Sequence, residues 1–170
     1  DKRKGIDYFV ESCKLLAEKY PELTSELGIV VYGKESEQLK PLVPFNVYPL
    51  NYISNEKELV DVYNAVDLFV TPSLEENLPN TIMEAMACGK PCVGFHVGGI
   101  PEMSDHLHNG YVAEYQSSED FANGIYWALG EGEYQSLSEE ARRKVLSSYS
   151  ESIIAKKYIE VYNKITGDHA

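Results

Sequence analysis

The stretch Asp67–Val97, DLFVTPSLEENLPNTIMEAMACGKPCVGFHV, decides the fold of this chain. Its apolar run at 68–70 predicts a short, buried parallel strand. A polar loop follows, and Pro79 suits the first position of a mostly apolar helix that Gly89 ends. Residues 92–97 are typical of the next buried strand. The order strand, loop, helix, strand predicts two parallel strands joined by a right-handed crossover.

Glu84 places a carboxylate in the middle of this apolar helix. Burying an unpartnered carboxylate is costly, so Glu84 must either face water or have a partner. Helical side chains lean toward the N-terminus, so Glu84 shares a stripe with Asn80 and points toward the loop that carries Glu76. We expect the two glutamates to converge where the free N–H groups of the helix N-terminus favour a phosphate. Alternatively, Thr81, Glu84 and Cys88 form the solvent-facing side of an amphipathic helix.

The rest of the chain alternates helix and strand. Spacing of apolar residues and turn residues predicts helices at 6–20, from Asn55 or Ser54 to 66, from Ser117 to 129, at 133–148 and at 151–165, and strands at 29–32, 47–48 and 111–112. We therefore expect one α/β domain over residues 1–170, with a doubly wound parallel sheet. Ligands of such folds bind at the carboxyl ends of the strands.

The composition indicates which kinds of partner the protein can bind and in which compartment it works. Hydrophobic residues make up 44% and aromatic residues 11% of the 170 positions, which fits a soluble globular domain. The formal net charge of -12 argues against nucleic acid or an anionic membrane, since either requires a basic patch. Cys13, Cys88 and Cys92 lack metal-ligand spacing and predict reduced thiols in the cytosol. The chain has neither a signal-peptide pattern nor an apolar run near the ~18 residues of a spanning helix.

Several linked motifs resemble one enzyme family. They are Glu76-x7-Glu84 within PSLEENLPNTIMEAMACGKPCV, Gly98-Gly99-Ile100-Pro101-Glu102, Lys4-Gly5-Ile6-Asp7 and Asn109-Gly110-Tyr111-Val112. Together they resemble the C-terminal domain of the retaining glycosyltransferases of family 4. The resemblance implies one half of a two-domain GT-B fold, a Rossmann-like sheet with strand order 3-2-1-4-5-6. Family members place the central first strand just before the Lys4 loop, so we expect that strand to be missing here and the sheet to be incomplete.

The resemblance also implies roles for individual residues. Lys4 would stabilise charge on the leaving diphosphate, and Glu76 would hold donor-sugar hydroxyls at the reaction centre. Glu84 would accept hydrogen bonds from the ribose hydroxyls. The family often has Phe-Gly where this chain has Leu78-Pro79, and the proline removes one possible amide donor. The candidate catalytic residues are therefore Glu76 and Lys4, and the candidate nucleotide-sugar-binding residues are Glu84, Asn77, Leu78, Asn80 and Arg3, the last beside rather than at the usual arginine position.

The implied function is donor binding in a retaining hexosyltransferase. The substrate would be a nucleoside diphosphate sugar of the UDP or GDP type, and the acceptor would be a glycan or a lipid-linked glycan in surface polysaccharide biosynthesis. The acceptor would bind an absent N-terminal domain. No metal, other cofactor, nucleic acid or direct membrane insertion is implied. The resemblance places the protein in the cytoplasm, with peripheral association at the inner membrane for the full-length protein.

Two other classes of function stay open. One is a sugar-nucleotide epimerase with the GT-B fold. The other is a nonenzymatic nucleotide-binding or regulatory α/β module, such as a receiver domain. A receiver needs a phosphorylatable aspartate where a central strand ends, and Thr71-Pro72-Ser73 at that position argues against it. In the leading interpretation we expect the isolated chain to be inactive, because one wall of the cleft cannot orient an acceptor or exclude water. Its exposed surface should include the tyrosine-rich face of the last helix.

Overall fold

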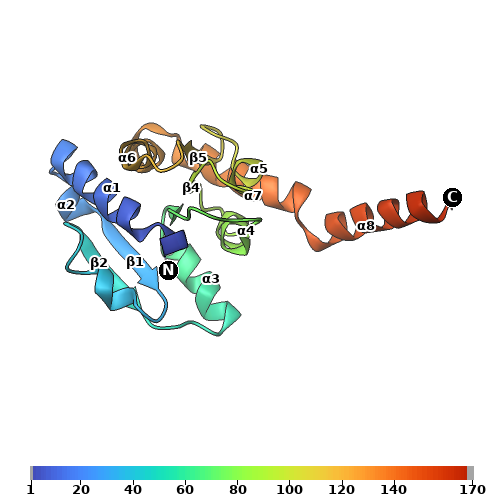
Figure 1. Cartoon of the computed structure of the whole chain (residues 1–170), viewed down its shortest axis with the longest axis horizontal. Helices are drawn as coiled ribbons and strands as arrows, with labels where there is room; N and C mark the ends of the chain where they lie inside the picture. Colours follow the sequence, from blue (N-terminus) through green and yellow to red (C-terminus); the bar gives the residue numbers. More distant parts are fainter. Residues whose placement is uncertain (1, 168–170) are drawn as a thin grey trace.

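Parallel strands covered by helices make up the computed structural model, which describes residues 2–167 (Figure 1). The strands are β1 (Gly28–Tyr32), β2 (Asn46–Leu50), β3 (Phe69–Thr71), β4 (Cys92–Phe95) and β5 (Gly110–Ala113). The α-helices are α1 (Ile6–Lys19), α2 (Leu23–Glu26), α3 (Glu56–Asn64), α4 (Asn80–Ala87), α5 (Ile100–Met103), α6 (Ser118–Tyr126), α7 (Tyr134–Ser148) and α8 (Glu151–Thr166). Short 3-10 turns η1 (Lys2–Lys4) and η2 (Ser36–Leu39) and a π-helical turn η3 (Trp127–Glu131) complete the described elements.

The strands form two separate parallel sheets. β1 pairs with β2, and β3, β4 and β5 pair in that order. Within residues 2–167 no strand pairing joins β1 to β3. These are the strands that the expected order 3-2-1-4-5-6 places on either side of the first strand. The prediction of an incomplete sheet is confirmed, and the single sheet is replaced by two.

The side chains of β4 show why helices cover both faces of the sheet that contains this strand. Val93 and Phe95 belong to a core cluster with residues of α1 and α6. Cys92 belongs to a second cluster, with residues of α4, α5 and α7, and Gly94 lies against Ile100 of α5. Successive side chains of a strand point to opposite faces, so this alternation buries both sides of β4. The α/β doubly wound architecture is confirmed.

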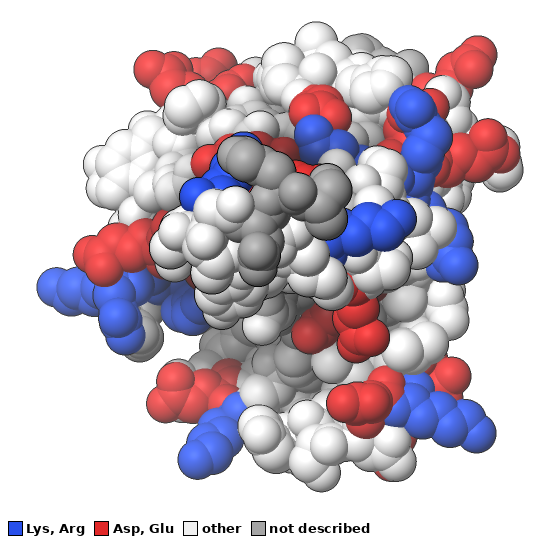
Figure 2. Space-filling model, turned by 90° about the vertical axis from the view of Figure 1, so that its right-hand side faces the viewer, with Lys and Arg blue, Asp and Glu red and all other residues white. Residues whose placement is uncertain are grey.

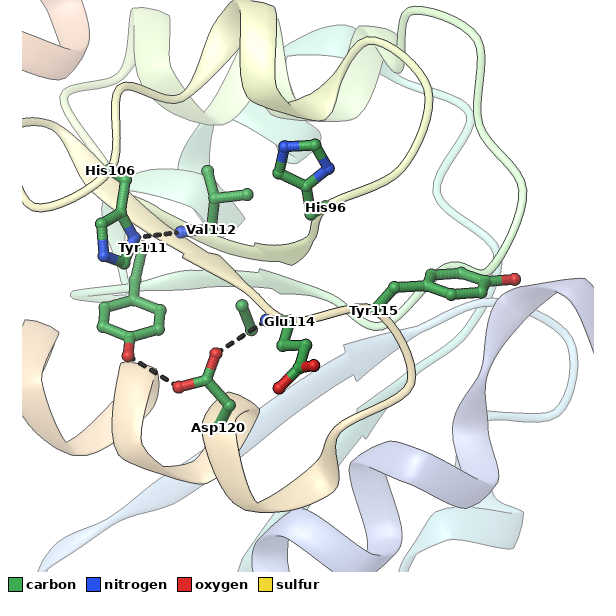
Figure 3. Close-up of a pocket in the computed structure, with 8 residues that line it drawn as sticks. His96, His106, Tyr111, Val112, Glu114, Tyr115 and Asp120 are labelled. Atoms are coloured by element: carbon green, nitrogen blue, oxygen red, sulfur yellow. Dashed lines mark hydrogen bonds between the residues drawn. The ribbon is translucent and has the colours of Figure 1, made fainter.

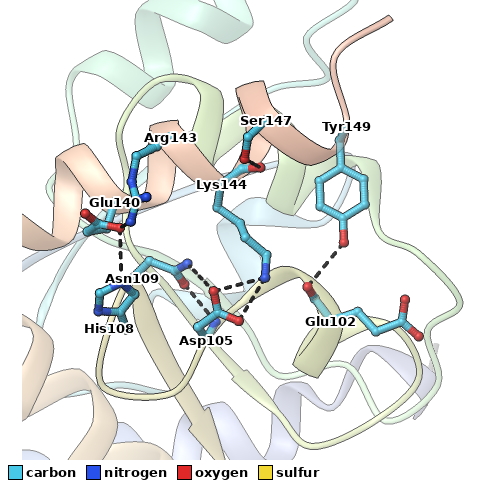
Figure 4. Close-up of polar contacts among 9 residues, drawn as sticks. All are labelled: Glu102, Asp105, His108, Asn109, Glu140, Arg143, Lys144, Ser147 and Tyr149. Carbon is cyan, nitrogen blue, oxygen red and sulfur yellow. Dashed lines mark hydrogen bonds and ion pairs between the residues drawn. The ribbon is translucent and has the colours of Figure 1, made fainter. Parts of the chain in front are cut away.

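Polar contacts fasten α7 to the segment that leads into β5 (Figure 4). The Nζ atom of Lys144 lies 2.8 Å from Oδ1 of Asp105 and 3.0 Å from its Oδ2. The backbone N–H of Asp105 donates to the side chain of Asn109, which is 1% exposed. His108 and Glu140 form a second link, with 3.0 Å between Nε2 and Oε2. These contacts hold the start of β5 against the helical layer.

Helix α8 projects away from the rest of the molecule (Figure 1). It has no buried residue, and its exposed apolar side chains include Tyr158, Tyr162 and Ile165, which are 62%, 61% and 75% exposed. The expectation of an exposed tyrosine-rich face is therefore confirmed. None of the helices in residues 2–167 combines the length and hydropathy that crossing a bilayer requires.

Several predicted boundaries differ from the structure by one to three residues, and two of these differences have a clear cause. Pro79 is the N-cap of α4 rather than its first helical residue, because its backbone is extended, with ψ 113°. β4 ends at Phe95 rather than Val97, because the N–H of Val97 donates to the carbonyl of Phe95 and turns the chain.

The cysteines Cys13, Cys88 and Cys92 are free thiols, as predicted. Burial raises the pKa of Cys13 to about 12 and also raises the pKa of Cys92. These two thiols therefore stay protonated and pack as small apolar side chains.

Candidate functional site

The loop between β3 and α4 lies against the N-terminal segment. The backbone N–H of Leu74 donates to the carbonyl of Arg3 at 2.7 Å. The Nζ atom of Lys4 lies 3.1 Å from Oε1 of Glu76, an ion pair between residues 72 positions apart. The Glu76 side chain is 17% exposed and that of Lys4 is 60% exposed. The structure thus brings together the two residues predicted to be catalytic.

Two glycines make the approach of these loops possible. Gly5 and Gly98 have φ values of 63° and 54°, a region that residues with a Cβ rarely adopt. A Cβ at Gly5 would overlap the carbonyl of Pro72, and a Cβ at Gly98 would overlap the carbonyl of Glu76. The loop that carries Glu76 therefore contacts the backbone at Gly5 on one side and the backbone at Gly98 on the other.

Glu84 lies on α4 and has a different partner. The hydroxyl of Tyr63, on α3, donates to its Oε2 atom at 2.9 Å. The hydroxyl of Tyr32, at the end of β1, lies 3.3 Å from that of Tyr63. Burial raises the pKa of Tyr63 well above its usual value, and contacts with Tyr32 and Glu84 add to the effect. Tyr63 therefore remains protonated and can donate.

The remaining predicted site residues are exposed, and in the sequence they lie within a few positions of Lys4, Glu76 or Glu84. Asn77 and Leu78 lie on the loop after Glu76, and the carbonyl of Asn77 accepts a hydrogen bond from Gly99. Asn80 is the first residue of α4, and the side chain of Arg3 is exposed. Among the described residues, Lys4 donates a hydrogen bond to Glu76 and Tyr63 donates one to Glu84, so the two carboxylates have different partners.

The N-terminus of α4 can accept an anion. Its N-cap is Pro79, and no side chain in residues 2–167 caps the helix. Uncapped N–H groups and the helix dipole together favour a phosphate. In the described part of the chain, no group of three or more histidine, cysteine, aspartate or glutamate side chains is arranged to hold a metal ion.

A cavity of about 480 Å³ lies beside the edge strand β5 and contains none of the predicted site residues (Figure 3). Its polar groups are largely paired with each other. The hydroxyl of Tyr111 and the backbone N–H of Glu114 both donate to Asp120, at 2.8 and 2.7 Å. The N–H of Val112 donates to Nδ1 of His106 at 3.1 Å. These contacts explain the polar residues in structural terms.

The prediction from sequence missed Tyr63 and Tyr32 as parts of the site. It placed Tyr63 on the apolar face of a helix and Tyr32 at the end of a strand, which the structure confirms. A tyrosine on a buried face is itself a signal, because its hydroxyl usually requires a hydrogen-bond partner. The sequence did not indicate that the partner would be Glu84.

The fold and these loops define a doubly wound α/β domain with a candidate anion site near the carboxyl ends of its strands. The sequence profile of the family described as "Glycosyl transferases group 1" matches residues 1–131. The chain belongs to this family.

Curated relatives agree with this assignment. An uncharacterized glycosyltransferase of Haemophilus influenzae is 32% identical over 143 residues, which cover 82% of this chain and 40% of the relative. The N,N'-diacetylbacillosaminyl-diphospho-undecaprenol alpha-1,3-N-acetylgalactosaminyltransferase of Campylobacter jejuni is 27% identical over 163 residues, 95% of this chain and 42% of the relative. The chain thus spans about two fifths of the length of these proteins.

Solved structures confirm the fold. HepE of Anabaena, in complex with UDP, superposes with a TM-score of 0.78 at 21% identity, over 96% of this chain and 46% of HepE. The C-terminal domain of the glycosyl transferase group 1 protein LpcC of Francisella tularensis superposes with a TM-score of 0.68 at 21% identity, over 89% of this chain and 82% of that domain. The described fold is that of GT-B C-terminal domains.

The glycine contact at the site can be tested with Gly98→Ala. We expect the free energy of unfolding to fall by at least ~1 to 2 kcal/mol, because alanine is strained at positive φ and its Cβ displaces the Glu76 carbonyl. Urea denaturation measures this. Gly130→Ala is the control, since a Cβ there meets no atom within 4 Å. Equal stability of Gly98→Ala and the wild type would show that the loops do not depend on this contact.

Proposed function

We propose that this chain is the donor-binding domain of a retaining glycosyltransferase of family 4. The full-length enzyme would transfer a sugar from a UDP- or GDP-sugar to a glycan or lipid-linked acceptor. The observation that carries the proposal is the pairing of Lys4 with Glu76 across 72 positions, on the loop that leads into an uncapped helix bearing Glu84. Family membership and the UDP complex of the structural neighbour HepE support it.

Lys4 and Glu76 would act at the sugar and diphosphate. In the structure they neutralise each other, and the Lys4 side chain is largely exposed. An exposed pair of this kind contributes little stability, so the cost of separating it is small. An incoming diphosphate could therefore take Lys4 as its cation and leave Glu76 to accept hydrogen bonds from sugar hydroxyls. Lys4 would then stabilise the charge that grows on the leaving diphosphate.

Glu84 and the start of α4 would bind the nucleotide. A carboxylate can accept hydrogen bonds from both hydroxyls of a ribose, and hydrogen bonds to a charged acceptor are strong. The uncapped N–H groups of α4 would face a phosphate. No metal is required in this scheme, because a lysine and a helix terminus supply the positive charge.

The surface charge supports a small ligand rather than a polyanion. The chain carries a formal net charge of -12. Figure 2 shows lysine and arginine side chains interspersed with aspartate and glutamate side chains over the face on which α8 ends. A phosphate would therefore be held by local groups such as Lys4, and not by a broad basic surface.

The two glutamates should respond differently to substitution. Glu84→Gln should weaken UDP or GDP binding by about one to two orders of magnitude, because it removes charge-assisted hydrogen bonds to ribose. Glu76→Gln should leave nucleotide affinity nearly unchanged and lower kcat of the full-length enzyme by about 100-fold, a typical cost of losing one group at a reaction centre. Calorimetry with nucleotide and kinetics with the sugar nucleotide measure the two effects.

Glu75→Gln is the matched control. Glu75 is exposed and adjacent to Glu76, so its substitution removes the same charge from the same loop without touching the proposed contacts. It should leave both affinity and turnover unchanged. If Glu75→Gln lowers turnover as much as Glu76→Gln, the effect is one of net charge and the role of Glu76 is refuted.

Binding should also be independent of divalent metal. With EDTA in excess, the dissociation constant for UDP or GDP should change by less than about two-fold, since lysine and helix N–H groups bind the phosphates. Titration calorimetry with and without Mg²⁺ measures this. A strict magnesium requirement would contradict the proposed phosphate site.

A further inference from the structure

We propose that Tyr63 is a positioning residue that holds the Glu84 carboxylate in the orientation that receives the ribose. This inference depends on the proposed function, because it assumes that Glu84 binds the nucleotide. Tyr63 itself would not touch the ligand, since its side chain lies in the core with 2% exposure. Its hydroxyl donates to Oε2 of Glu84 at 2.9 Å.

The hydrogen bonds that link Tyr32, Tyr63 and Glu84 have one consistent set of donors and acceptors. A tyrosine hydroxyl carries a single proton, and that of Tyr63 is donated to Glu84. The 3.3 Å contact between the hydroxyls must then be donated by Tyr32 to Tyr63. A hydroxyl that accepts one hydrogen bond becomes a better donor in the next. Tyr32 on β1 and Tyr63 on α3 therefore act in sequence on a carboxylate of α4.

The hydrogen bond from Tyr63 holds one oxygen of the Glu84 carboxylate and leaves the other able to bind a ligand. Among the described residues, Tyr63 is the one side chain that donates a hydrogen bond to Glu84, and it binds Oε2. Glu84 is exposed, so Oε1 is free to accept from a ligand hydroxyl. An exposed glutamate without such a bond would sample several rotamers and lose that freedom on binding. Anchoring one oxygen to a buried donor removes part of this cost before the ligand arrives.

The anchor is itself rigid. The ring of Tyr63 packs edge-on against Phe69 of β3, with 5.9 Å between the ring centroids. Close packing and 2% exposure restrict the positions open to this ring, whereas Glu84 is an exposed side chain. The ring can therefore contribute packing while the hydroxyl contributes orientation. Tyr63→Phe separates these two contributions, because it keeps the ring and removes the hydroxyl.

The test compares two ligands in Tyr63→Phe and the wild type of the full-length protein. The probes are UDP or GDP, whichever the wild type binds more tightly, and the corresponding 2',3'-dideoxynucleoside diphosphate. We expect Tyr63→Phe to weaken binding of the ribose form by about 3- to 30-fold, in line with loss of one hydrogen bond to a charged group. Its affinity for the dideoxy form should change by less than about two-fold.

Tyr111→Phe is the matched control. It also removes a tyrosine hydroxyl that donates to a carboxylate, here Asp120 at 2.8 Å, but away from the loops of the site. It should leave the affinity for both probes unchanged. A double-mutant cycle adds a second readout: in a Glu84→Ala background, Tyr63→Phe should cause no further loss of affinity for the ribose form.

Each outcome decides the question. Equal losses for ribose and dideoxy probes, or additive losses in the cycle, would show that Tyr63 only supports the fold and would overturn the inference. Unchanged affinity in Tyr63→Phe would overturn it as well. If the wild type binds neither nucleotide, or if Glu84→Gln binds as the wild type does, the proposed function fails first. Should Tyr63→Phe not fold, Tyr32→Phe takes its place, with a smaller loss confined to the ribose probe expected.

Discussion

The loop of residues 72–79 lies in backbone contact with segments from two other parts of the chain, and the rest of the site depends on that contact. On one side the carbonyl of Pro72 meets Gly5, and on the other the carbonyl of Glu76 meets Gly98. Neither contact leaves room for a Cβ. Because the backbone of the loop is held twice, the side chain of Glu76 and the first turn of α4 have defined positions before any ligand binds.

Much of the fold was predictable, because the patterns that mark helices and their ends involve residues that are close together in the sequence. Apolar periodicity located the helices at 133–148 and 151–165 within one residue of α7 and α8. Cap residues were also reliable: the side chain of Asn55 accepts from the N–H of Lys57 at the start of α3. Such signals involve residues within one helical turn, where the chain itself fixes the distance between them.

The partners of the site residues were not predictable in the same way. The hydrogen bond from Tyr63 to Glu84 links two helices, and the ion pair of Lys4 with Glu76 spans 72 positions. Spacing along the chain carries no information about such pairs until the layers are packed. The convergence of Glu76 and Glu84 was inferred from the direction of helical side chains alone. The structure gives each carboxylate its own donor, a lysine for Glu76 and a buried tyrosine for Glu84, and the convergence of the two glutamates on one ligand stays a prediction.

The division of the strands into two sheets has a consequence for cooperativity. Backbone hydrogen bonds hold β1 to β2 and hold β3, β4 and β5 together, whereas in residues 2–167 the two groups are linked by side chains. These include a shared core with Phe9 and Val47, and Tyr63, which contacts Tyr32 of β1 and Phe69 of β3. Side-chain packing can loosen without breaking either ladder. Under partial denaturation the two groups can therefore open as separate units, and amide hydrogen exchange would detect them as two levels of protection.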